Sequence, residues 1–303
     1  MRGTARSLIF ATSLATSALS ACGDDESVTG ETLTIDTPSF TLQPGEEKFY
    51  CYYTTLPTAE ATGIYRMASS MPPGSHHMIV FKTRTALEPD GTLAECENFG
   101  MGAGGITDVP MWLYAAQEPE EQFTMPDDVG IAVAAGQPVI VNMHYINQSD
   151  APLTANVHVE LGAFKPGVTF TPAHTYVTFN TQIDVPPGAM GSAGGSCDVP
   201  ADAKFLYMST HSHKYTTRAQ VHDGDRMVLE TTDWAHATLV EWPAPHYSFA
   251  SGKLTYRCDY NNTTNQPLRT GESALANEMC MAVGVIFPAH GDTFCINNFT
   301  ITL

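Results

Sequence analysis

The stretch Pro138-Val139-Ile140-Val141-Asn142-Met143-His144-Tyr145-Ile146-Asn147 has the side-chain period of a half-buried strand. The apolar side chains at its odd-numbered positions would lie on one face, and Asn142 and His144 would lie on the other. Residues 204–213 and 278–287 alternate in a similar way, and turns rich in Pro and Gly separate such segments. No long stretch has helical periodicity, so the sequence predicts an all-β protein.

Length and composition favour two domains built from strands and turns. The chain has 303 residues, of which 43% are hydrophobic and 15% charged, with 20 Pro and 24 Gly. This length allows two ordinary domains with cores of their own, and the composition favours strands over helices. We expect sandwich-type domains at residues 33–165 and 166–303, with a boundary near Phe164-Lys165-Pro166-Gly167 and no evident internal repeat.

The first 22 residues have the features of an export signal. Arg2 and Arg6 precede a short apolar run, and Leu19-Ser20-Ala21-Cys22 resembles a bacterial lipobox, in which Cys22 would be acylated. An ordinary secretory signal cleaved near Ala21 is the alternative. Residues 23–32 are expected to form a flexible tether. The prediction is a lipid-anchored protein of the bacterial cell envelope, facing the periplasm or the cell exterior.

The charge of the chain excludes one class of partner. The formal net charge is -18, and removal of residues 1–21 takes away two positive charges (Arg2 and Arg6) and no negative ones, which gives -20. Nucleic-acid binding needs clustered Lys and Arg, so we expect no nucleic-acid partner. The expected membrane contact is through the lipid anchor only.

The cysteines indicate an oxidising compartment. Without Cys22, six of the seven cysteines remain, which in an exported chain favours three disulfides. Two of the six lie before residue 100 and four after residue 196, so we expect one bridge in the first half and two in the second. The residues alone leave the pairing open.

Four sequence elements carry possible metal ligands. His211 and His213 are two apart on a predicted strand, so their side chains would point the same way, whereas adjacent His76 and His77 would share a site only on a distorted strand or through different ring nitrogens. A surface or packing role is the alternative for each, as it is for His144.

Met279, in Asn-Glu-Met-Cys-Met, offers a thioether, although methionine mostly fills gaps in cores. Thioethers suit copper(I) and bind zinc, calcium or magnesium poorly. If these groups hold a metal, the chemistry favours copper.

The order of these elements resembles the copper type II, ascorbate-dependent monooxygenases, the family that includes peptidylglycine α-hydroxylating monooxygenase and dopamine β-monooxygenase. The resemblance covers about residues 33–303, in an exported lipoprotein-type chain. It implies two tandem antiparallel, jelly-roll-like β-sandwich domains, one copper ion in each, with an open cleft between them. The matching elements are His76-His77-Met78, His144-Tyr145, His211-Ser212-His213 and Glu278-Met279-Cys280.

The resemblance also assigns roles. His76, His77 and His144 would hold the electron-transfer copper, and His211, His213 and Met279 the catalytic copper. The disulfides it implies are Cys51–Cys96, Cys197–Cys295 and Cys258–Cys280. The peptide-processing members carry Arg, Asn and Tyr where this chain has Ser209, Met281 and Val283. These three residues would line a less charged pocket, because the carboxylate clamp is missing.

The resulting hypothesis is an oxidoreductase that hydroxylates a C–H bond of a small substrate other than peptidylglycine. It would use two copper ions per chain, O₂, and ascorbate or another one-electron reductant, and it would act as a monomer. The alternative is a non-catalytic copper-binding lipoprotein that captures or delivers copper in the envelope.

Overall fold

The structure, a computed structural model, describes residues 28–96 and 109–303, and all regular elements in these ranges are β-strands. The prediction of an all-β protein is confirmed. The predicted signal, the lipobox Cys22 and residues 23–27 of the predicted tether lie outside the described residues. Within the two described ranges, no helix has the length and apolar character needed to cross a membrane.

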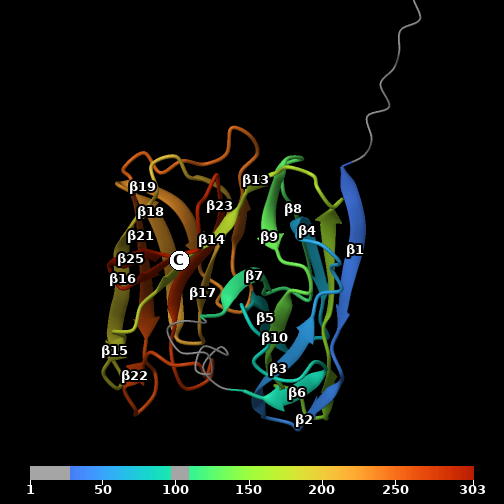
Figure 1. Ribbon diagram of the computed structural model, residues 1–303. Helices are drawn as coiled ribbons and strands as arrows, with labels where there is room; N and C mark the ends of the chain where they lie inside the picture. Colours follow the sequence, from blue (N-terminus) through green and yellow to red (C-terminus); the bar gives the residue numbers. More distant parts are fainter. Residues whose placement is uncertain (1–27, 97–108) are drawn as a thin grey trace, which may run out of the picture.

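The strands form two groups that follow one another along the chain and lie side by side (Figure 1). The first group is β1 (Thr29–Asp36), β2 (Phe40–Leu42), β3 (Glu47–Thr55), β4 (Thr62–Ser70), β5 (Ser75–Lys82), β6 (Thr92–Glu95), β7 (Met111–Ala116), β8 (Glu120–Thr124), β9 (Val129–Val133), β10 (Pro138–Ile146), β11 (Leu153–Ala155), β12 (His158–Phe164) and β13 (Thr171–Pro172). The second is β14 (His174–Phe179), β15 (Asp184–Val185), β16 (Met190–Asp198), β17 (Lys204–Ser212), β18 (Thr216–Asp223), β19 (Arg226–Thr231), β20 (Leu239–Glu241), β21 (Lys253–Asn261), β22 (Leu268–Arg269), β23 (Cys280–Phe287), β24 (Thr293–Ile296) and β25 (Phe299–Thr302).

Each half has two larger sheets with a buried apolar cluster between them. In the first half the orders are β1-β12-β4-β9-β13, with β8 on β4, and β6-β3-β10-β5-β7. In the second half they are β20-β17-β23-β14-β24-β25 and β16-β21-β18-β19. Most pairings are antiparallel, but β13 pairs with β9 and β14 with β24 in parallel. Because β13 still joins a first-half sheet, the chain passes to the second half after Pro172, slightly beyond the expected boundary.

The two halves repeat one topology, a feature that the sequence analysis missed. The order β3-β10-β5-β7 corresponds to β16-β21-β18-β19, and β1-β12-β4 corresponds to β14-β23-β17. The same corner follows β10 and β21: the Asn147 and Asn262 side chains each accept a hydrogen bond from a hydroxyl two residues on. The matching segments, residues 145–153 and 260–268, share only Tyr, Asn, Pro and Leu at equivalent places, which is too little to reveal a repeat.

The halves pack through non-equivalent sheets. The β3-β10-β5 face of the first half meets the β14-β23 face of the second in an apolar cluster that includes Ile79, Ile140, Val177 and Met281. Lys82 of β5 also forms an ion pair with buried Asp292, at 3.9 Å. The residues on these two faces are therefore brought together, although they come from different positions of the repeat.

The three disulfides confirm the pairing that the family resemblance implied. They join Cys51 to Cys96, Cys197 to Cys295, and Cys258 to Cys280. The first lies in the first half and the other two in the second, as the distribution of cysteines predicted. Cys280 is the first residue of β23, so the third bridge fixes that strand directly beside Met279.

Candidate metal centre

A β-bulge places the two adjacent first-half histidines together. On β10, His144 pairs with His77 and the next residue, Tyr145, pairs with Ser75, so that His76 is an extra residue on β5. A bulge of this kind overrides the alternation of side chains along a strand. The ring centres of His76 and His77 lie 5.2 Å apart, and they lie 4.9 and 5.0 Å from that of His144. The distortion that the sequence required is therefore present.

The register of β17 and β23 places the second-half candidates on one face. Ser209 pairs with Val283 and His211 with Met281. The ladder ends with Ser212 paired to Cys280, and its register, continued by one residue on each chain segment, would bring His213 opposite Met279. Because side chains alternate along paired strands, these six residues share a face, and that face points toward the first half.

The five imidazoles form one cluster across the interface between the halves. The His76 ring centre lies 4.9 Å from that of His211 and 5.4 Å from that of His213, and the His77 ring centre lies 4.8 Å from that of His211. The ligand atoms of His76, His77 and His211 all lie within 4.8 Å of one another. All five rings are buried. The resemblance implied two sites across an open cleft, whereas here the sheets that carry the two ligand sets pack directly together.

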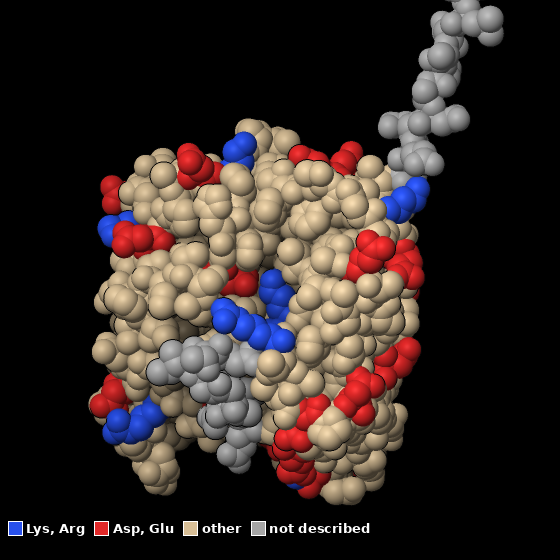
Figure 2. Space-filling view, in the orientation of Figure 1, with Lys and Arg blue, Asp and Glu red and all other residues tan. Residues whose placement is uncertain are grey.

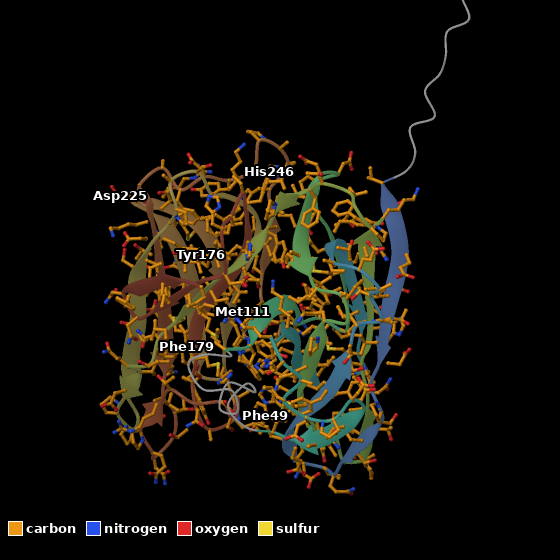
Figure 3. The ribbon with its side chains drawn as sticks, viewed as in Figure 1. Phe49, Met111, Tyr176, Phe179, Asp225 and His246 are labelled. Atoms are coloured by element: carbon orange, nitrogen blue, oxygen red, sulfur yellow. A yellow bond between two sulfur atoms is a disulfide. The ribbon has the colours of Figure 1, made fainter. Side chains whose placement is uncertain are left out.

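The tautomer of His144 is fixed by a carboxylate that spans the interface. His144 Nε2 donates to Glu47 Oε1 at 2.8 Å, and the ring stacks on Phe49 with centres 3.9 Å apart (Phe49 is labelled in Figure 3). Glu47 also accepts hydrogen bonds from the Ser273 hydroxyl and the Ala274 N–H of the second half, each at 2.6 Å. His144 therefore keeps Nδ1 as the ring atom available to a metal.

The second-half rings have the opposite tautomer. His211 Nδ1 donates to Gln117 Oε1 at 2.7 Å, and Gln117 Nε2 donates to the Thr210 carbonyl at 3.0 Å. Gln117 belongs to the first half, so this contact also crosses the interface. His213 Nδ1 donates to the Asn277 carbonyl at 3.2 Å. Both rings therefore offer Nε2 to a metal.

The electrostatics of the cluster keep the imidazoles neutral. Burial lowers the pKa of His211 to about 3, and the pKa values of His76, His77 and His213 lie well below the usual range because of burial and then because of the neighbouring rings. In the described ranges, His76 Nε2, His144 Nδ1, His211 Nε2 and His213 Nε2 are buried without a hydrogen-bond partner. Neutral rings with buried, unpaired nitrogen atoms are what a metal ion needs.

Glu278 supports the segment that carries His213 and Met279. Its buried carboxylate accepts hydrogen bonds from the N–H groups of His213 and Tyr215 and from the Thr216 hydroxyl. Burial raises its pKa to about 7, although these hydrogen bonds act against that shift. Met279 itself is 1% exposed, and its carbonyl accepts a hydrogen bond from buried Tyr260. The thioether is therefore held in the buried apolar cluster between the halves.

A cavity of about 50 Å³ is lined by residues of both halves, including His77 and His211. The three residues expected to line the substrate pocket, Ser209, Met281 and Val283, all line it. Its other walls are largely apolar or aromatic, formed in part by Ile79, Trp112, Tyr114, Tyr207 and Leu239.

Three residues that shape the site were not singled out in the sequence: Glu47, Gln117 and Trp234. Glu47 and Gln117 lie 97 and 94 residues from the histidines that they contact, and Trp234 faces His76 with ring centres 5.4 Å apart. Each partner comes from a distant strand or loop. No local spacing in the sequence marks such contacts, because they depend on how the halves dock.

Comparisons with known proteins give no relative. No family model matches the chain, and no curated protein matches it. Among solved structures, the chain is similar to a Macrobrachium rosenbergii nodavirus structure at a TM-score of 0.21 and 8% identity, over 94% of this chain and 98% of that one. It is also similar to an empty particle of cowpea mosaic virus at a TM-score of 0.25 and 8% identity, over 90% and 95%. Likenesses this weak support no conclusion about function.

Proposed function

We propose that this protein is a copper-dependent monooxygenase that hydroxylates a C–H bond of a small, largely apolar molecule, using O₂ and a one-electron reductant. One observation carries the proposal: buried imidazoles from both halves converge, and two of them, His77 and His211, line an apolar cavity. Binding sites for small molecules are typically concave, mostly apolar and supplied with a few polar groups. The three disulfides fit an exported, envelope-located protein.

The residues present fit copper. His76, His77 and His144 would hold one ion, and His211, His213 and Met279 another, since imidazole suits copper in general and a thioether favours copper(I). The unpaired ring nitrogen atoms of His76, His144, His211 and His213 supply lone pairs for this purpose. Bound copper would supply O₂ activation and one-electron chemistry.

The chain's own residues prepare the site for this reaction. Glu47, Gln117 and the Asn277 carbonyl orient three rings and fix their tautomers. The apolar walls of the cavity would exclude water and hold the substrate beside His77 and His211. Orientation and exclusion of water account for much of the rate enhancement at such sites.

Copper stoichiometry tests the ligand assignment. We expect metal analysis and EPR to find two copper ions per reconstituted chain, and about one in the His211→Ala variant, because that variant loses a ligand of the second set. His290→Ala, at an exposed histidine of the same half, is the matched control and should bind as much copper as the original chain. An unchanged copper content in His211→Ala would contradict the assignment.

Replacement of the thioether tests catalysis. Met279→Leu removes the sulfur at nearly constant volume, a change that usually costs less than about 1.5 kcal/mol of stability. We expect reductant-driven, substrate-dependent O₂ consumption to fall to background while the circular dichroism spectrum is unchanged. Met208→Leu, at another fully buried methionine, should keep its activity. Full activity of Met279→Leu would sink the catalytic role, and copper binding without any O₂ consumption by the original chain would favour copper capture or delivery.

A further inference from the structure

Burial of the imidazoles limits where an electron donor can approach. None of the five histidines is more than 7% exposed, so a donor has to bind within a short distance of the cluster. Among the described residues, the cluster contacts the apolar cavity at His77 and His211 and a wider depression of about 390 Å³ at His76. The apolar cavity suits an apolar substrate. The depression is therefore the better place for a polar donor.

Both halves build this depression. The loop after β10 contributes Gln148 and Ser149, and the second half contributes Trp234, whose ring centre lies 5.4 Å from that of His76. The aromatic face of Trp234 and the amide and hydroxyl groups of the loop suit a flat molecule with hydroxyl groups.

The charge around the depression disfavours an anion. Of the residues that the structure describes, no charged one lines it, and exposed Asp150 and Asp233 are the chain neighbours of two lining residues, Ser149 and Trp234. The whole chain carries a formal charge of -18, and Figure 2 shows acidic side chains on both halves. An approaching anion would be slowed by this negative field, whereas a neutral molecule would not.

We propose, on the basis of the function proposed above, that the depression between Trp234 and the loop at Gln148 binds the electron donor, and that this donor is a neutral hydroquinone. Each hydroquinone loses one electron and one proton. The electron would reduce a copper(II) ion held by the histidines to copper(I), and the proton would pass to water. Two of the resulting semiquinones then disproportionate to one quinone and one hydroquinone, which balances the reaction.

Two variants test the depression, one by removing a contact and the other by filling the space. Trp234→Leu removes the aromatic contact, and Gln148→Trp fills the depression from an exposed position, where a larger side chain leaves the fold intact. The matched control is Met190→Trp, at a site of the second half that is 77% exposed and outside the depression. Circular dichroism establishes that each variant is folded.

The first measurement needs no copper: binding of 1,4-hydroquinone to the metal-free protein by saturation-transfer NMR. Loss of one aromatic contact worth ~1 kcal/mol should weaken binding about fivefold in Trp234→Leu. Gln148→Trp should abolish binding and Met190→Trp should not change it. Wild-type binding in both Trp234→Leu and Gln148→Trp would overturn the proposed site.

The second measurement is the anaerobic loss of the copper(II) EPR signal after mixing with a donor. Hydroquinone should reduce the original chain at a rate that does not depend on ionic strength, and both variants should react more slowly. Ascorbate, an anion, should react faster as salt is added, because salt screens repulsion. Slower reaction of ascorbate with added salt would contradict the choice of a neutral donor. If the chain binds hydroquinone but no copper, the proposed function fails and the binding site stands.

Discussion

The metal-free protein is expected to lose most of its stability as the pH falls from 7 to about 4. In the unfolded chain each histidine takes up a proton near pH 6.5, whereas in the folded chain burial delays protonation. Below pH 6.5 the unfolded state therefore binds more protons, and the free energy of unfolding falls with pH. Below pH 6.5, each imidazole that stays neutral in the folded chain lowers the free energy of unfolding by about 1.4 kcal/mol for each unit by which the pH falls. For His211, whose pKa is lowered to about 3, the loss continues down to that pH.

Two carboxylates have the opposite effect on the pH dependence of stability. Burial raises the pKa of Glu278 to about 7 and that of Glu121 above its usual range. Each gains a proton more readily in the folded chain, so each contributes stability as the pH falls toward the unfolded value near 4.5. The five imidazoles outnumber these two carboxylates, so the free energy of unfolding still decreases as the pH falls.

Urea unfolding at a series of pH values between 7.5 and 4 measures this slope. His211→Asn removes one titrating ring and should reduce the slope by up to about 1.4 kcal/mol per pH unit. His290→Asn, at an exposed histidine, should leave it unchanged. Copper loading should move the loss to lower pH, because a metal holds its ligands deprotonated. A free energy of unfolding that is constant from pH 7.5 to 5 would show that the imidazoles are hydrated and that the halves separate in solution.

The sequence could predict features that depend on local pattern. The alternation at residues 138–147 predicted a half-buried strand. The strand β10 is present, with the His144 face opposite the apolar face, but the prediction of half-burial is wrong: both faces are buried, because the face that carries Ile140 and His144 packs toward the second half. The spacing of His211 and His213 predicted a shared face on a strand. Both predictions follow from the two-residue period of side chains along a strand, which can be read from the order of residues within one segment.

The rest depends on how distant segments dock. A bulge at His76 is set by the pairing of β5 with β10, and the adjacency of His76 and His77 shows only that one is needed. The internal repeat was hidden because few residues are shared between its copies. The convergence of all five histidines follows from packing β3-β10-β5 against β14-β23, which no spacing within one half specifies.

Glu47→Ala is expected to damage stability and the metal centre together. The change removes one hydrogen bond to His144 and two hydrogen bonds from the second half. Hydrogen bonds to a charged group contribute about 1.5–3 kcal/mol each, so a loss of roughly 3 kcal/mol or more is expected from urea unfolding. His144 would also lose the partner that holds Nδ1 toward the cluster. Copper affinity of the first ligand set, measured by competition with a chelator, should fall by about 10- to 100-fold.

Two further variants separate this role from a general effect of charge. Glu47→Gln keeps a side-chain oxygen that can accept from His144 and Ala274, while the Ser273 hydroxyl can turn to accept from the new amide. It should therefore restore most of the stability and copper affinity. Glu95→Ala, at a carboxylate whose side chain is 60% exposed and contacts Lys48 and Tyr50 at the surface, should change neither stability nor copper affinity measurably.

The contacts of Glu47 make docking of the halves and orientation of His144 a single event. Its carboxylate joins a ring of the first half to residues 273–274 of the second, so whatever separates the halves also releases the ring. Linkage then requires the reverse: copper bound at the histidines should hold the halves together. Limited proteolysis should cut copper-loaded protein more slowly than metal-free protein, and Glu47→Ala should reduce this difference. Equal protection by copper in Glu47→Ala and in the original chain would show that the halves dock independently of this carboxylate.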